Sequence, residues 1–204
     1  MFTPAKEIPR EVNRKIWAQL ISPRPLALIS TLGEGDTPNI APYNSFSNIS
    51  TYPALIGISF GQREKEDKYT LRNIKTRQCF AINLVPRFLA ENMNEAARDA
   101  GTVDDFARLD LSRAECTSIV CPRIVECPAT LECKVVDFVS LRPSTAELVI
   151  AEVTGIWIRD EFALTDGMGM RGFDNLGADL LASVGTEDYI SVNGELIHLP
   201  AVWE

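Results

Sequence analysis

The side chains that most often support metal binding or nucleophilic catalysis are sparse in this sequence. It contains five cysteines and one histidine. Cys121, Cys127 and Cys133 recur every six residues, but no Cys-x-x-Cys pair occurs and a proline directly follows two of them. Zinc sites use closer cysteine pairs, usually with histidine partners. A zinc site is therefore the weaker interpretation, and we expect these thiols to act as small buried hydrophobic groups.

His198 is the only histidine around which a catalytic triad could be built, and no Gly-x-Ser-x-Gly elbow accompanies it. We interpret it as a surface or packing residue and assign no catalytic side chain. Hydride transfer needs little acid–base machinery from the protein, because the cofactor supplies the reactive atoms. The scarcity of nucleophiles and bases therefore leaves redox chemistry open.

Polar and cationic side chains instead gather in three segments. The first is Ser22-Pro23-Arg24-Pro25, which leads into an apolar run that ends at Ser30 and Thr31. The second runs from Asn39 to Ser47 and reads Asn-Ile-Ala-Pro-Tyr-Asn-Ser-Phe-Ser. The third is Lys68-Tyr69-Thr70-Leu71-Arg72-Asn73-Ile74, followed by Cys79-Phe80-Ala81-Ile82-Asn83-Leu84.

Length and charge limit what these segments can belong to. A chain of 204 residues predicts one domain, 1–204, with an N-terminal appendage over 1–20 and a C-terminal extension over 161–204. The net charge of −8 argues against binding to nucleic acid or to anionic membranes. The longest apolar runs, 26–29 and 54–58, are too short to span a bilayer. The charged N-terminal residues predict no secretory signal, so we expect a cytoplasmic protein with free thiols.

The elements that would position these segments are mainly strands. Strands are predicted at the apolar runs 26–31, 55–60, 80–85, 129–139 and 147–159, with a hairpin turn at 33–36. Helices are predicted at 12–20, 68–77 and 89–97, with a further possible helix at 176–182, whereas 101–116 reads as irregular. Many strands with only short helices favour a β-barrel over a doubly wound sheet. The Gly167–Gly172 run does not follow a strand or open a helix, so we reject it as a dinucleotide motif.

Taken in order and at this spacing, the three segments resemble the flavin reductase-like, FMN-binding split-barrel family, which includes flavoredoxin-type proteins. The resemblance covers about residues 20–160, with a weaker echo at Gly185–Tyr189. It implies a mainly β, Greek-key-like antiparallel split barrel with short flanking helices. It also implies FMN as the cofactor and a homodimer whose partner closes one side of the ligand site.

The resemblance carries nine residues over as cofactor-binding candidates, namely Arg24, Ser30, Thr31, Asn44, Ser45, Phe46, Lys68, Thr70 and Asn73. Cations, hydroxyls and the start of a helix suit a phosphate dianion. Tyr43 and Phe46 could wall a flat ring, and main-chain amides near Asn44 could reach its polar edge. Each residue alone has an ordinary interpretation as a turn, cap, solvated or core residue.

This sequence also departs from the family pattern. Tyr69 stands where the family often has an acidic residue, and the segment 183–186 lacks the usual arginine and glycine pair. Because of these departures, the resemblance does not assign residues of the C-terminal part to a nicotinamide or substrate pocket.

The resemblance implies an NAD(P)H:flavin reductase that passes a hydride from the nicotinamide to flavin N5. Reduced flavin would then serve a flavin-dependent monooxygenase or another electron acceptor. Two alternatives remain. One is a flavoredoxin-like electron carrier without reductase activity, and the other is a structural barrel that has lost its ligand. The sequence does not distinguish NADH from NADPH.

Overall fold

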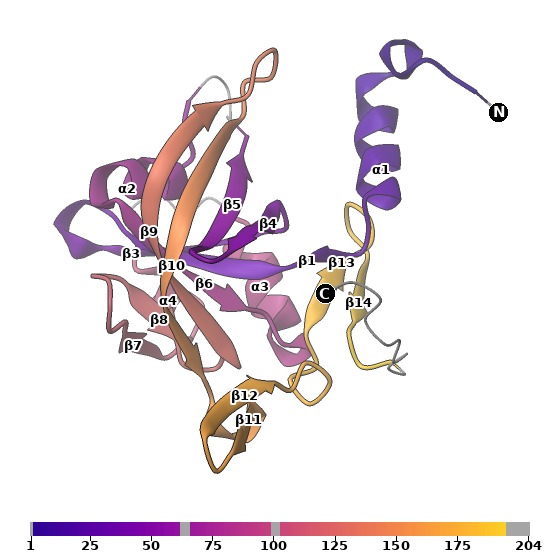
Figure 1. Cartoon of the computed structure of the whole chain (residues 1–204). Coiled ribbons are helices and arrows are strands. Elements are labelled where there is room, and N and C mark those ends of the chain that lie inside the picture. The colour runs from indigo at the N-terminus through magenta and orange to yellow at the C-terminus, as the bar shows by residue number, and fades with distance from the viewer. Residues whose placement is uncertain (1, 62–65, 99–102, 195–204) are drawn as a thin grey trace.

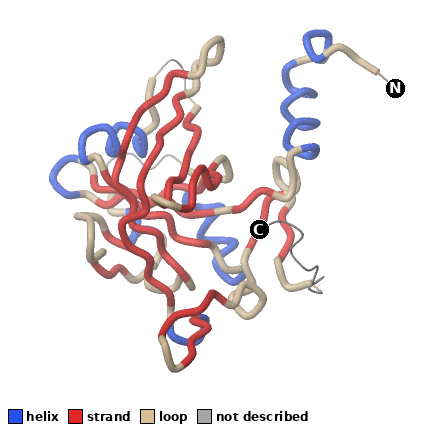
Figure 2. Tube along the Cα trace, viewed as in Figure 1, coloured by secondary structure: helices blue, strands red, loops and turns tan. Residues whose placement is uncertain are grey.

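The computed structural model describes residues 2–61, 66–98 and 103–194. Its centre is a curved antiparallel sheet with the strand order β3-β2-β6-β9-β10-β5-β4 (Figures 1 and 2). These strands are β2 (Ala27–Leu32), β3 (Pro38–Tyr43), β4 (Phe46–Thr51), β5 (Ala54–Phe60), β6 (Cys79–Leu84), β9 (Ala129–Ser140) and β10 (Glu147–Ile158).

The two edge strands of this sheet are consecutive in the chain. Only Asn44 and Ser45 connect the end of β3 to the start of β4, although the two strands stand at opposite ends of the strand order. Two residues span less than about 11 Å even when fully extended. The sheet must therefore curl back on itself, which makes it a barrel that is open between β3 and β4.

Short helices and small sheets surround the barrel. The helices are α1 (Arg10–Leu20), α2 (Tyr69–Arg77), α3 (Ala90–Ala96) and α4 (Asp105–Arg108), with 3-10 turns η1 (Ala5–Glu7), η2 (Glu34–Asp36), η3 (Arg87–Leu89) and η4 (Asp160–Phe162). The small sheets are formed by β1 (Arg24–Pro25), β13 (Leu181–Ser183) and β14 (Tyr189–Ser191), by β7 (Arg113–Glu115) and β8 (Pro122–Ile124), and by β11 (Ala163–Asp166) and β12 (Gly169–Phe173). Helix α1 projects away from the barrel (Figure 1).

Strand β2 is buried on both faces, which divides the molecule into two cores. Ala27 and Ile29 point into the barrel, where Leu71 and Ile74 of α2 join the same core. Leu28 points to the opposite face, where it packs with residues of α3 and α4. Successive side chains of a strand alternate between faces, so neighbouring residues of β2 serve different cores.

The prolines of β3 agree with its position at the edge of the sheet. Pro38 and Pro42 lie opposite Leu32 and Leu28 of β2. Ile40, midway between them, donates its backbone N–H away from β2 to Asp105 Oδ2 at 2.8 Å. Alternate residues of an antiparallel edge strand point their N–H groups away from the partner strand. Proline has no N–H to donate, so these positions tolerate it without loss of a ladder bond.

The structure confirms the mainly β, antiparallel architecture with short helices, and most of the predicted elements. Two predictions were wrong. The segment 101–116 contains α4 and β7, which are too short to give a periodic signal. The segment 176–182 is not a helix, because its end forms β13 and pairs with β1 and β14. Two further strands, β3 and β4, follow the predicted turn at 33–36 and were not among the predicted strands.

All five cysteines are free thiols, and none belongs to a group of possible metal ligands among the described residues. Burial raises the pKa of Cys121 and of Cys133 well above the ordinary value. The interpretation of the thiols as small buried groups therefore fits the structure. His198 lies outside the described residues. No helix in the described part of the chain has the length and apolar character needed to cross a membrane.

Candidate functional site

The first backbone amides of α2 have no hydrogen-bond acceptor within residues 2–61, 66–98 and 103–194. Lys68 is the N-cap residue, and its side chain makes no capping bond. The first turn of α2 contains no acidic residue. By contrast, the N-cap residue of α4, Asp104, accepts hydrogen bonds from two backbone amides of its helix. The first amides of a helix and the helix dipole attract anions. The start of α2 can therefore bind an anion, whereas the corresponding amides of α4 are already bonded to Asp104.

The Thr70 hydroxyl links α2 to β3. Thr70 is buried, and Asn39 Nδ2 donates to its Oγ1 at 3.3 Å. The phenol of Tyr43 lies near the same side chain, and burial raises the pKa of this phenol to about 12. The ammonium of Lys68 lies over the Tyr43 ring, 5.8 Å from its centroid. A cation, a hydroxyl and a neutral phenol are thereby held together at this end of the barrel.

A second contact fixes α2 to β2. Asn73 Nδ2 donates to Thr31 Oγ1 at 3.0 Å, and Thr31 is fully buried. Thr31 is the register partner of Asn39, so both side chains point to the same face of the sheet. We define the α2 site as the set of residues joined by these contacts, namely Thr31, Asn39, Tyr43, Lys68, Thr70 and Asn73.

The chain leaves the α2 site through the connection between β3 and β4. Asn44 directly follows Tyr43 and is half-buried. Ser45 is exposed, and its hydroxyl donates to the backbone oxygen of Ser59 at 2.7 Å. Ser59 also donates its N–H to the backbone oxygen of Ser45 at 3.0 Å, so the next residue, Phe46, points its own N–H away from β5. The free edge of β4 therefore presents a main-chain donor at Phe46.

The aromatic rings of Tyr43 and Phe46 point away from the α2 site. Tyr43 and Phe46 were expected to wall a flat ligand, but both side chains are buried in the barrel core. The Tyr43 ring packs against Phe60, with 4.8 Å between centroids. Of these two residues, Phe46 can offer a ligand only its backbone, and Tyr43 only its phenol oxygen. The alternation of side chains along the edge strands places these rings inside the barrel.

Ser30 lies on the opposite face of β2 from Thr31. Its hydroxyl donates to the backbone oxygen of Pro122 at 2.6 Å and accepts from Asn83 Nδ2 at 3.0 Å. The Asn83 side-chain oxygen in turn accepts from Ile124 N and Thr130 Oγ1. Ser30 thus belongs to a buried network in the second core. Ser30 and Thr31 are neighbours in a strand, so their side chains point to opposite faces and cannot share one site.

Arg24 is also separate from the α2 site. It lies on β1 and donates from Nη2 to Ser183 Oγ at 3.1 Å and to the backbone oxygen of Gly185 at 2.8 Å. Its Nε is buried without a partner among the described residues. These contacts tie the first strand to the C-terminal segment 181–185. Arg24 therefore stands at the far end of β1–β2 from Thr31.

The structure adds Asn39 to the predicted site residues. Asn39 belongs to the second polar segment of the sequence but was not among the nine candidates. Its register with Thr31 could have been anticipated, because a hairpin with its turn at 33–36 pairs the residues on either side. The hydrogen bond to Thr70 could not, since it depends on how α2 packs across the barrel end.

Comparisons with known proteins agree with this architecture. The family model described as "Flavin reductase like domain" matches residues 20–173. An uncharacterized protein of Deinococcus radiodurans is 29% identical over 163 residues, which cover 77% of this chain and 71% of that protein.

Two solved structures share the fold along nearly the whole chain. Nitrilotriacetate monooxygenase component B from Bacillus cereus superposes with a TM-score of 0.87 at 20% identity, covering 98% of each chain. A protein from Shewanella frigidimarina, described as a flavin reductase with a split barrel domain, superposes with a TM-score of 0.84 at 21% identity and covers 97% of this chain and 96% of its own. The barrel is therefore a split barrel, and the chain belongs to the flavin reductase like domain family.

Proposed function

We propose that this protein binds FMN with its phosphate at the α2 site and acts as an NAD(P)H:flavin oxidoreductase. The observation that carries the proposal is the uncapped start of α2, where Lys68 and Thr70 stand together in a protein of net charge −8. An acidic protein repels anions at long range, so an anion-binding group needs a concentrated local set of donors. Family membership favours a flavin as the ligand that carries the anionic group.

The donor set of the α2 site fits a phosphate monoester. The first backbone amides of α2 have no acceptor among the described residues, and the Lys68 ammonium adds a full positive charge. Thr70 Oγ1 accepts from Asn39, which leaves its own hydrogen free to be donated to a ligand or to Tyr43. Charge-assisted bonds of this kind are about twice as strong as neutral ones.

The path from α2 to β4 suits the rest of a flavin. Asn44 and Ser45 follow the α2 site along the chain, and β4 presents the free N–H of Phe46 at its edge. Main-chain donors fixed by a strand favour an acceptor that gains negative charge, as the pyrimidine edge of a flavin does on reduction. Because the side chains of Tyr43 and Phe46 are buried, the flavin ring would rest on backbone atoms and not between aromatic side chains.

The protein's own role is then binding and orientation. Bound FMN supplies the redox chemistry, since its N5 position accepts a hydride from NAD(P)H. Lys68 and Thr70 hold the phosphate, Asn39 and Asn73 fix α2 against the sheet, and the β4 edge orients the ring. No side chain is assigned a proton-transfer role. The Tyr43 phenol, whose pKa lies near 12, stays neutral at physiological pH and serves as a hydrogen-bonding group.

We also propose a cytoplasmic homodimer that supplies electrons to a flavin-dependent partner. Among the described residues no strand pairs with the outer edge of β4, and Ile49 and Tyr52 expose apolar side chains in this strand and just after it. A symmetric partner would cover this edge and enclose the ring. The fold shared with nitrilotriacetate monooxygenase component B supports a monooxygenase as one candidate electron acceptor.

The test is to purify the protein, measure bound flavin by its visible absorbance, and follow NADH and NADPH consumption with and without added FMN. The proposal predicts FMN binding and flavin-dependent consumption of at least one nicotinamide. Bound FMN with no consumption would indicate the flavoredoxin-like alternative, an electron carrier reduced by another enzyme. Absence of flavin binding would contradict both.

A further inference from the structure

Helix α1 presents an apolar face that the described part of its own chain leaves largely uncovered. Val12, Ile16 and Leu20 recur every four residues along one side of the helix, and Trp17 lies beside them. Trp17 is 63% exposed and Leu20 is 71% exposed, and the helix projects away from the barrel (Figure 1). Single exposed apolar residues are ordinary, whereas a continuous apolar stripe marks an interaction surface.

A helix as short as α1 needs a packing partner in order to be stable. It has 11 residues, and its N-cap residue, Pro9, supplies no side-chain cap. Helices shorter than about 12–15 residues are marginal in water on their own, and most take their stability from tertiary packing. Within the described structure, Ala18 is the only residue of α1 that is buried. The surface that covers α1 is therefore not among the described elements of the same chain.

Strand β14 offers a surface of complementary character. It is the outer strand of the small sheet β1-β13-β14, which stands on the same side of the molecule as α1 (Figure 1). Ile190 in this strand and Val192 just after it are two residues apart, so they point to one side of the strand, and both are exposed. Tyr189, which points to the other side, is exposed as well. Helix α1 therefore leaves β14 of its own chain uncovered.

The charges favour a second copy of this chain as the partner. Residues 1–21 contain four basic and two acidic side chains, which gives this segment a net charge of +2, whereas the whole chain has a net charge of −8. The rest of each copy therefore carries −10 and attracts the basic α1 segment of another copy. Arg10 lies one heptad before Trp17, and Glu187 lies two residues before β14. An anionic lipid surface would attract α1 but would repel the rest of the chain.

We propose that α1 of each chain packs across β14 of a second copy of the chain, in a reciprocal exchange. Trp17 and Leu20 cover the exposed apolar side chains of β14, and Arg10 faces Glu187. Two-fold symmetry makes each of these contacts twice, which doubles the apolar area that is covered. Tryptophan is enriched among the residues that carry most of the binding energy of an interface, so association depends most on Trp17 and its neighbours in the stripe.

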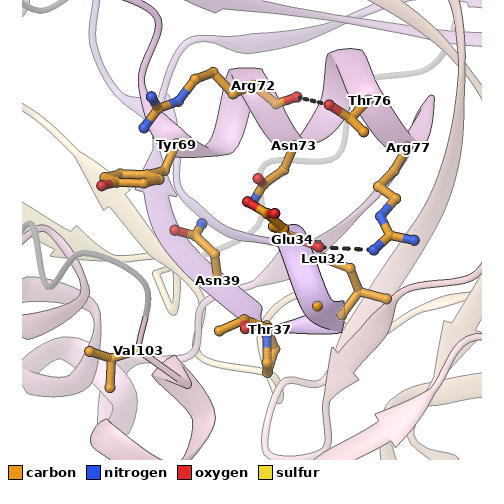
Figure 3. A pocket seen from close by; sticks show the side chains of 13 residues that line it. Leu32, Glu34, Thr37, Asn39, Tyr69, Arg72, Asn73, Thr76, Arg77 and Val103 are labelled. Carbon is orange, nitrogen blue, oxygen red and sulfur yellow. Dashed lines mark hydrogen bonds between the residues drawn. The ribbon is translucent and has the colours of Figure 1, made fainter.

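This contact goes beyond the proposed function and is separate from it in space. Among the described residues, none of α1 or β14 belongs to the α2 site, and none lines the cavity that adjoins this site between α2 and the β2–β3 turn (Figure 3). The proposed homodimer covers the edge of β4, which belongs to a different sheet. FMN binding and the exchange of α1 can therefore succeed or fail independently.

The test places the photoreactive residue benzoylphenylalanine at the position of Trp17 in the whole chain. Equal amounts of isotope-labelled and unlabelled protein are mixed, allowed to exchange, irradiated, and digested for mass spectrometry. We expect crosslinked peptides that join a labelled chain to an unlabelled one, with capture at residues 187–192. Leu20→Glu should lower this inter-chain yield at least about tenfold. Val136→Glu, which places the same charge on an exposed site of β9, is the matched control and should leave the yield unchanged.

Two further variants test how α1 is placed. The photoreactive residue at the position of Arg14, on the polar face of the helix, should capture little of the second chain. Arg10→Glu and Glu187→Lys should each lower the inter-chain yield about threefold, because each brings like charges together. The double variant restores opposite charges and should recover most of the yield. A double variant as weak as either single variant would overturn the placement of α1 across β14.

The remaining outcomes separate the exchange of α1 from the proposed function and from other partners. Inter-chain capture at 187–192 in a protein that binds no FMN would support the exchange and contradict the proposed function. Capture only within one chain, or no capture by a protein whose circular dichroism is unchanged, would overturn the exchange. Flotation of the wild type, but not of Leu20→Glu, with phosphatidylglycerol vesicles would assign the apolar face of α1 to a lipid surface and would also overturn it.

Discussion

Asn73 of α2 donates a hydrogen bond to the hydroxyl of Thr31 on β2, at 3.0 Å. Thr31 is fully buried, so its polar atom has no access to water and depends on this partner. The same side chain lies close to the β2–β3 turn, since a Cβ added at Gly33 would lie 3.4 Å from Asn73 Oδ1. One side chain thereby supports the barrel end and positions both the α2 site and the adjoining cavity.

Asn73→Leu should therefore lower the free energy of unfolding by about 1–3 kcal/mol, because Thr31 is left buried without a partner. Urea denaturation of the apoprotein measures this change. The double variant Asn73→Leu with Thr31→Val removes both polar groups and should recover part of the loss. If the double variant loses as much stability as the sum of the two single variants, the two residues are not coupled and the contact is not what holds α2.

Lys68→Gln should weaken FMN binding about tenfold and riboflavin binding less than about twofold, because only FMN carries the phosphate. Flavin fluorescence quenching measures both affinities. Lys15→Gln, which removes the same charge from α1, is the matched control and should leave both unchanged. Equal losses for the two flavins would place Lys68 near the ring and not at the phosphate.

Ser30→Ala should separate folding from binding. Its hydroxyl bonds to Pro122 and Asn83 in the second core, so its loss should lower the free energy of unfolding by about 1–3 kcal/mol. FMN affinity, measured well below the melting temperature, should change less than about twofold, since Ser30 faces away from the α2 site. Ser140→Ala at the exposed end of β9 is the control for stability. A tenfold loss of FMN affinity in Ser30→Ala would mean that the serine reaches the ligand after all.

Tyr43 should give the protein a measurable pH dependence in alkali. Burial raises the pKa of its phenol from 10.0 to about 12, so the unfolded chain releases this proton before the folded one does. The contribution of Tyr43 to stability is complete below pH 10 and is lost as the pH rises toward 12. Its full size is about 3 kcal/mol.

The measurement is urea denaturation of the wild type and of Tyr43→Phe between pH 9 and pH 12. Ionisation of the buried thiols in alkali lowers the free energy of unfolding of both proteins alike. The difference between the two curves therefore isolates the contribution of the phenol. We expect the wild type to lose stability more steeply than the variant over this range. Parallel curves would show that the phenol is not shielded from water.

The long strands were predictable because their residues are apolar and their ends are marked. The runs 129–139 and 147–159 correspond to β9 and β10, and the turn between them ends both. The pair β3 and β4 was harder, since Pro42 and a series of small polar residues interrupt the apolar pattern. Those prolines are tolerated at an edge, and edge position is a property of the whole sheet that no local window contains.

The candidate site was predictable in its residue types and only partly in its geometry. The ordered polar segments located Lys68, Thr70 and Asn73. The packing of α2 brings Asn73 to Thr31 on β2, and brings Thr70 and Lys68 to side chains of β3. Side-chain direction was the missing information. Strand alternation sends Ser30 to the second core and the Phe46 ring into the barrel. Arg24 is drawn to Ser183 by pairing between β1 and β13, which are distant in the sequence.

Binding of the FMN phosphate by the start of α2 should make FMN a better ligand than riboflavin, which lacks the phosphate. Equilibrium dialysis of the wild-type protein against FMN and riboflavin, in the same low-salt buffer, tests it most directly. We expect saturable binding of FMN that is about tenfold or more tighter than binding of riboflavin, and we expect the difference to shrink as salt is added. Equal affinity for the two flavins, or binding of neither, would contradict it.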